Sequence, residues 1–195
     1  MKKLIKQIMS SDSLKARFLN TLSLLEYIGA RKILKSQDQE TFHAQLLNHV
    51  AEEIRHAQVL KRMALKIEPE LCMTYAPNAL FCGEEASHYF QVIDHAAQEL
   101  FSERDTWISY LYTTYLIEKR ATELYKSIDE VLVGLGGSPL FRGILVEEDR
   151  HLDEIKTALT QVPAARARLE KLEVVEAEAI SQLIQVMEKA LEKMN

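Results

Sequence analysis

Residues that break helices are few in this chain, and they gather in a handful of places. The 195 residues include only six glycines and four prolines, which fall mainly between residues 69 and 83, between 134 and 139, and at 163. A polar run over 36–41 makes a further interruption. No segment between these points keeps the period-two alternation of a half-buried strand. We therefore predict an all-α chain, with helices over residues 12–36, 40–66, 84–100, 103–133, 138–161 and 164–193.

The connections between these helices differ in length. The first two helices need only a tight turn, and so do the helices on either side of the glycine-rich run, where we expect Ser138 to cap a helix that begins at Pro139. Between residues 66 and 103 lies a longer passage with its own shorter helix. Two antiparallel hairpins joined by a long crossover form a known four-helix-bundle topology. We predict one domain over 1–195, comprising a bundle over 12–161 and an additional amphipathic helix over 164–193.

The composition indicates a soluble globular protein, since 47% of the residues are hydrophobic and 27% are charged. The net charge of −5 gives no general attraction to nucleic acid or to anionic lipid. The N-terminus, MKKLIKQIM, lacks the apolar run of a signal peptide, and we expect a short helix packed on the bundle. No stretch approaches a membrane span. Cys72 and Cys82 are too few for a disulfide framework, so we expect a cytoplasmic protein.

The pattern E-E-x-R-H occurs twice, in the segments AEEIRH and VEEDRH. The second glutamate and the histidine of each segment are three residues apart, which places them on one face of a helix. These pairs are Glu53/His56 and Glu148/His151. Apolar residues one turn before and after share their faces, so we expect both pairs to point into the core.

The first glutamate and the arginine of each segment share a polar face instead. We expect Glu52 with Arg55, and Glu147 with Arg150, to form exposed ion pairs within one helix. Such pairs contribute a few tenths of a kcal/mol. Each segment therefore combines an outward pair with an inward pair.

Two further glutamates, Glu26 and Glu118, also lie in apolar surroundings. In an antiparallel hairpin, residues at one level are equidistant from the turn. The midpoint between Glu26 and Glu53 falls in the polar turn, and the midpoint between Glu118 and Glu148 falls at the edge of the glycine-rich turn. Four carboxylates in one dry interior would repel each other strongly. Two divalent or trivalent metal ions would remove that conflict.

Other acidic and histidine residues compete for a metal role. Glu123 lies five residues beyond Glu118, a rotation of about 140° on the helix, and its depth matches less well. Glu40 and His43 fall in a first helical turn, where a glutamate complements the helix dipole. A stripe on the crossover helix is a possible second site, although we favour an exposed polar face; it consists of Glu85, His88, His95 and Glu99.

Three side chains are candidates for supporting the metal ligands rather than binding metal. His49 lies one turn before Glu53, and we favour a supporting or packing role over ligation. Tyr115 and Tyr125 are placed to supply hydrogen bonds near the carboxylates, although aromatic residues at helical spacing more often belong to the core.

The candidate residues follow an order that resembles the ferritin-like di-iron carboxylate superfamily: Glu26, Glu53-x-x-His56, Glu118 and Glu148-x-x-His151. The resemblance covers about residues 12–161. It implies that Glu53 and Glu148 bridge two metal ions, that Glu26 and Glu118 are terminal ligands, and that each histidine binds one ion. Histidines on both the second and the fourth helix make the chain more similar to the rubrerythrin and oxygenase branch than to cage ferritins. No CxxC pairs follow in this sequence, so we expect no rubredoxin-like module of the kind that full rubrerythrins carry.

The resemblance implies a non-haem dinuclear metal oxidoreductase. Histidine and carboxylate ligands suit two iron ions, or alternatively manganese or a mixed pair. Dioxygen or peroxide and a small-molecule substrate would be its reactants, with electrons from an external donor. The alternatives are a protein for iron binding, storage or detoxification, and a scaffold that keeps the ligands without the chemistry. The amphipathic helix over 164–193 either covers the bundle or joins two subunits in a homodimer.

Overall fold

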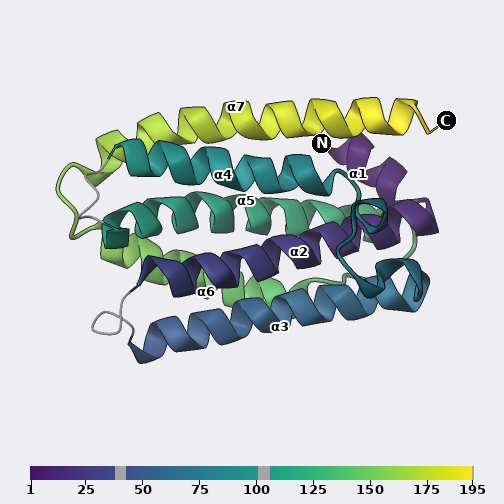
Figure 1. Ribbon diagram of the computed structural model, residues 1–195, viewed down its shortest axis with the longest axis horizontal. Helices are drawn as coiled ribbons and strands as arrows, with labels where there is room; N and C mark the ends of the chain where they lie inside the picture. Colours follow the sequence, from purple (N-terminus) through teal and green to yellow (C-terminus); the bar gives the residue numbers. More distant parts are fainter. Residues whose placement is uncertain (38–42, 101–105, 195) are drawn as a thin grey trace.

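The protein is an all-α helical bundle in a computed structural model that describes residues 1–37, 43–100 and 106–194 (Figure 1). No strand occurs within these ranges. Two single 3-10 turns, Leu71–Met73 and Pro77–Ala79, lie in the passage between residues 67 and 83. The α-helices are α1 Lys2–Met9, α2 Asp12–Ser36, α3 Ala44–Ile67, α4 Gly83–Glu99, α5 Thr106–Gly134, α6 Arg142–Leu159 and α7 Ala165–Glu192. The predicted all-α class is confirmed, and so is the helical character of each predicted segment within the described ranges.

Four of the helices, α2, α3, α5 and α6, form two packed pairs. Helix α2 packs along α3, and α5 packs along α6, with successive helices running in opposite directions (Figure 1). Helix α4 lies between α5 and α7, and α7 covers the side of the bundle farthest from α3. The short helix α1 packs against α2 and α5 with its apolar residues Leu4, Ile5 and Ile8 buried, as the sequence predicts. No helix of the described chain is both long enough and apolar enough for a membrane crossing.

The start of α6 differs from the prediction. The helix begins at Arg142, and neither Ser138 nor Pro139 belongs to it. The carboxylate of Asp129, near the end of α5, instead accepts hydrogen bonds from the backbone N–H groups of Leu140, at 2.6 Å, and Phe141, at 3.2 Å. The neighbouring helix therefore supplies the acceptor for backbone donors just before α6, where sequence spacing gives no sign of it, and no described side chain caps α6 itself.

The passage between α3 and α4 is held on α2 by buried polar side chains. Asn20 donates to the carbonyl oxygens of Thr74 and Ala79, at 3.0 and 2.9 Å. The Thr21 hydroxyl accepts from the backbone N–H of Phe81 at 2.9 Å. These contacts explain why α2 carries fully buried polar residues, and they fix the crossover at one end of the bundle.

Candidate metal centre

Helices α2, α3, α5 and α6 bring the six predicted metal-binding side chains together in the core. Each of these side chains is at most 8% exposed, and His56, Glu148 and His151 are each only 1% exposed. Apolar residues one turn away along each helix bury the site, as the sequence pattern predicts. The contributions are Glu26 from α2, Glu53 and His56 from α3, Glu118 from α5, and Glu148 and His151 from α6.

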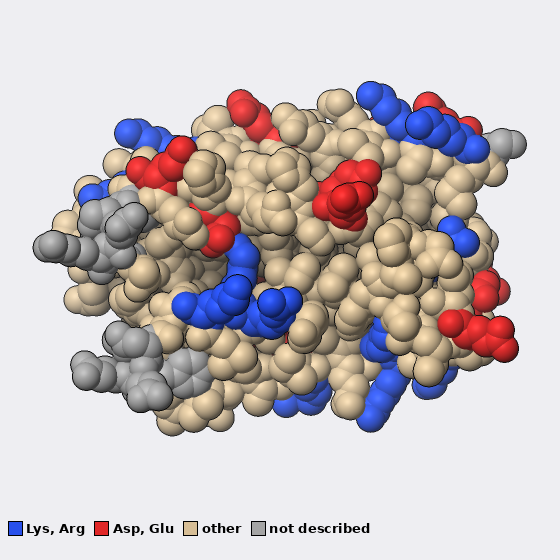
Figure 2. Space-filling view, viewed as in Figure 1, with Lys and Arg blue, Asp and Glu red and all other residues tan. Residues whose placement is uncertain are grey.

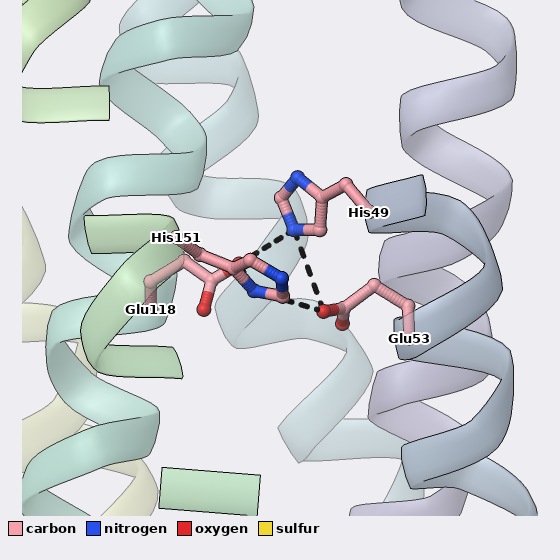
Figure 3. Close-up of side chains that lie close together, drawn as sticks. All are labelled: His49, Glu53, Glu118 and His151. Atoms are coloured by element: carbon pink, nitrogen blue, oxygen red, sulfur yellow. Dashed lines mark hydrogen bonds and ion pairs between the residues drawn. The ribbon is translucent and has the colours of Figure 1, made fainter. Parts of the chain in front are cut away.

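The donor atoms form two overlapping groups, and the atoms within each group lie within 4.8 Å of one another. One group consists of Glu26, Glu53, His56 and Glu148. The other consists of His49, Glu53, Glu118 and His151, and Figure 3 shows these four converging from α3, α5 and α6. Glu53 belongs to both groups, so its carboxylate lies next to both positions at which a cation could bind.

His49 lies closer to the centre than the sequence suggests. Its Nε2 atom is 3.1 Å from Oε1 of Glu118 and 3.4 Å from Oε1 of Glu53. The other ring nitrogen, Nδ1, is 3.3 Å from the hydroxyl of Tyr110, a contact that sequence reasoning missed. The signal was present, because His49, Glu53 and His56 follow each other at four- and three-residue steps on one helix face. The structure places His49 among the donor atoms.

Several buried polar atoms of the centre have no hydrogen-bond partner among the described residues: Oε1 of Glu53, both carboxylate oxygens of Glu148, and Nδ1 of His56 and His151. An unsatisfied buried donor or acceptor costs about 1–3 kcal/mol. Although Nδ1 of His56 is 3.0 Å from Oε1 of Glu148, the pair does not form a hydrogen bond. Cations between these atoms would satisfy all of them, since imidazole nitrogen and carboxylate oxygen are the donors that iron and manganese accept.

The outer glutamates form their shortest ion pairs between helices, whereas the sequence predicted pairs within one helix, of which Glu52 with Arg55 is present only as a longer contact. The carboxylate of Glu147 on α6 accepts from Nη2 of Arg55 on α3 at 2.6 Å, and the carboxylate of Glu52 on α3 accepts from Nη2 of Arg150 on α6 at 2.5 Å. Within α3 itself, Arg55 and Glu52 are 3.9 Å apart. The pairs therefore cross between helices, because α3 and α6 lie side by side with their E-E-x-R-H segments at one level.

These outer carboxylates also hold the histidines of the centre. Nε2 of His56 is 2.7 Å from Glu147, and Nε2 of His151 is 2.7 Å from Glu52. A carboxylate can only accept, so each Nε2 must carry the proton, and Nδ1 is then the atom that can bind a cation. This carboxylate–histidine arrangement is the one that orients metal-binding imidazoles in proteins. The repeated motif thus gives each helix an inward ligand pair and an outward glutamate that orients the other helix's histidine.

The electrostatics of the centre favour either protons or metal ions. Burial raises the pKa of Glu26 and Glu118 well above the usual range, and burial together with Glu148 raises the pKa of Glu53 to about 7. Burial lowers the pKa of His56 and His151, but nearby carboxylates outweigh it and bring each to about 9. Bound cations must therefore displace protons from the centre.

Of the other residues that the sequence suggested for the centre or its support, some lie at the centre and others lie outside it. The hydroxyl of Tyr125 donates to Oε1 of Glu26, whereas the Tyr115 ring lies against Lys119 away from the centre. Glu123 is an exposed partner of Arg120, so the choice of Glu118 agrees with the structure. His43 is exposed, and Glu40 lies outside the described residues. The crossover stripe is an exposed polar face, as favoured from the sequence: Glu85, His88, His95 and Glu99.

Comparisons with models of protein families, with curated proteins and with solved structures find no match. The centre is therefore defined by its own geometry: buried carboxylates, buried imidazoles and unsatisfied donor atoms at the middle of a helical bundle. These side chains can hold metal ions.

Removing an outer glutamate should weaken metal binding without touching a donor atom. We expect Glu147→Ala and Glu52→Ala each to lower the affinity for Fe²⁺ or Mn²⁺ by about 10- to 100-fold, because one imidazole loses its fixed orientation. Titration of metal into the metal-free protein measures the effect. Asp153→Ala removes an exposed carboxylate of α6 and serves as the control. Equal affinities in all three variants would contradict the role assigned to Glu52 and Glu147.

Proposed function

We propose that the chain is a dinuclear metal oxidoreductase of the ferritin-like type, with α2/α3 and α5/α6 as its two antiparallel hairpins. The proposal rests chiefly on one observation: the two groups of donor atoms overlap at Glu53, so a single carboxylate can contact two cations at once. Two isolated mononuclear sites would have no need of a shared ligand.

The residues of the chain prepare this centre in distinct ways. Glu53 would bridge the two ions, Glu26 and His56 would belong to one, and Glu118, His151 and His49 to the other, with Glu148 on the side of the first group. Iron or manganese bound there would supply the electrons for reducing dioxygen or peroxide while a substrate is oxidised. The Tyr125 hydroxyl donates a hydrogen bond to Glu26, and the Tyr125 ring is stacked on Phe141. The stacked ring holds the hydroxyl, and the hydrogen bond holds the carboxylate of Glu26 in place.

The surroundings support chemistry rather than bulk storage. The centre is enclosed by apolar side chains that exclude water, and an apolar cavity reaches its carboxylates. An external donor would supply the electrons for repeated turnover. Dioxygen or peroxide and a small molecule would be the reactants.

Loading with iron under anaerobic conditions, followed by exposure to air, tests the proposal. We expect about two Fe²⁺ ions to bind per chain and to be oxidised together, as a dinuclear centre requires. Continued uptake and oxidation of many further ions per chain would favour storage instead. Failure to bind iron in a fixed ratio would contradict both functions and leave the bundle as a scaffold.

A further inference from the structure

Two hollow regions meet at the metal centre, and their walls differ in chemistry. An inner cavity of about 110 Å³ runs from the carboxylates toward α1, α4 and α7. An outer pocket of about 570 Å³ lies on the other side, among α2, α4 and the beginning of α5. Both are lined by Gly29 and Ile117 and by the site carboxylates Glu53 and Glu118. A molecule that extends from one region into the other must therefore pass directly over the centre.

Apart from the site carboxylates at one end, the inner cavity offers almost no free polar group. Apolar side chains, chiefly leucine, isoleucine and phenylalanine, make up most of its wall. Arg120 forms two hydrogen bonds with Glu176, both at 2.7 Å, and the hydroxyl of Tyr89 donates to the same carboxylate at 2.6 Å. Thr21 is bonded to the backbone of Phe81. A polar ligand would lose its hydrogen bonds with water here and gain none, so the cavity suits an apolar chain.

The outer pocket, in contrast, presents polar and basic groups. Lys32 lies 2.9 Å from Asp94, and Lys35 adds a second positive charge to the same wall of the pocket. Figure 2 shows basic side chains gathered over this part of α2. Deeper in the pocket, Oγ1 of Thr113 is buried and has no hydrogen-bond partner among the described residues. A ligand group that accepts hydrogen bonds and carries negative charge would satisfy both features.

Gly29 lies where the inner cavity and the outer pocket meet, and it has no side chain to fill that space. A Cβ atom at this position would lie 3.5 Å from Oε2 of Glu53, so any longer side chain on α2 would project toward that carboxylate. The absence of a side chain leaves room for a ligand between α2 and the centre.

From this arrangement we propose that the substrate is a slim aliphatic chain ending in a carboxylate. The chain lies in the inner cavity, the carboxylate lies in the outer pocket near Lys32 and Thr113, and the intervening carbons pass the centre at Gly29. The proposal deepens the proposed function by naming the substrate class of the same site.

Binding of straight-chain carboxylates to the manganese-loaded protein tests this assignment by calorimetry. Across hexanoate, octanoate and decanoate we expect the affinity to rise about fourfold per added methylene, until the chain fills the inner cavity. Ala121→Phe places a ring in the inner cavity and should weaken decanoate binding by about tenfold or more. Ala177→Phe makes the same change on the exposed face of α7 and should leave binding unchanged.

The position of the charged end is tested separately. Lys32→Ala should weaken binding of decanoate but not of decanol, since only the carboxylate uses the positive charge. Equal affinity across the chain-length series, or an equal effect of the two phenylalanine variants, would overturn the proposal. Metal content is measured on every sample. Two bound ions without carboxylate binding would refute the substrate class alone, whereas carboxylate binding without bound metal would refute the dinuclear function.

Discussion

Replacing Glu53 by alanine should remove both metal ions from the chain. Glu53 is the one residue that belongs to both groups of donor atoms, so its loss opens both coordination positions at once. Glu118→Ala should remove only one ion, because Glu118 belongs to a single group. Glu148→Ala should likewise remove only one ion, because among the described residues Glu148 belongs to the other group alone. Elemental analysis of protein loaded with Fe²⁺ under anaerobic conditions gives the ratio of metal to chain for each variant.

The chain offers a closely matched control for this experiment. Glu85 and His88 on α4 repeat the Glu-x-x-His spacing of the centre, but both side chains are exposed. Glu85→Ala should therefore keep the full metal content. Folding of the Glu53→Ala variant is checked by circular dichroism, and we expect it to be retained, since removing one of four buried carboxylates lowers their mutual repulsion. Metal that survives the loss of Glu53 would refute a shared dinuclear centre.

The sequence predicted the helices and the inner side chains well, because both depend on periodicity along one helix. Glu26 and Glu118 emerged from their apolar neighbours and from their distance to the turns. The structure brings both beside Glu53 and Glu148. Equal depth in two hairpins is a geometric consequence of the constant rise of an α-helix.

What the sequence could not supply were contacts between helices. Glu52 and Glu147 each pair with an arginine of the other helix, and this depends on how α3 and α6 lie against each other. The contact of Asp129 with the backbone before α6 depends on the path of the glycine-rich turn. Glu52 and Glu147 had plausible partners within their own helices, but nearer partners on the other helix took precedence.

Helix α7 poses a related question, since Glu176 interrupts its apolar stripe. In the structure the stripe covers the bundle, with Leu172 and Leu183 buried. Glu176 itself is 6% exposed and accepts hydrogen bonds from Arg120 and Tyr89. The interruption is thus a buried ion pair that ties α7 to α5 and α4.

Glu176→Ala should lower the free energy of unfolding of the metal-free protein by about 1–3 kcal/mol, because the Tyr89 hydroxyl loses its acceptor and Arg120 keeps only the exposed Glu123 as a partner. Chemical denaturation measures this. Glu173→Ala removes a carboxylate from the same helix, but its partner Lys119 is half-exposed, so the expected loss is below about 1 kcal/mol. Replacing both partners, as Arg120→Met with Glu176→Leu, should recover most of the stability, since no unpaired charge remains. If Glu176→Ala cost no more than Glu173→Ala, the ion pair would not be what holds α7 on the bundle, and the apolar stripe alone would account for its position.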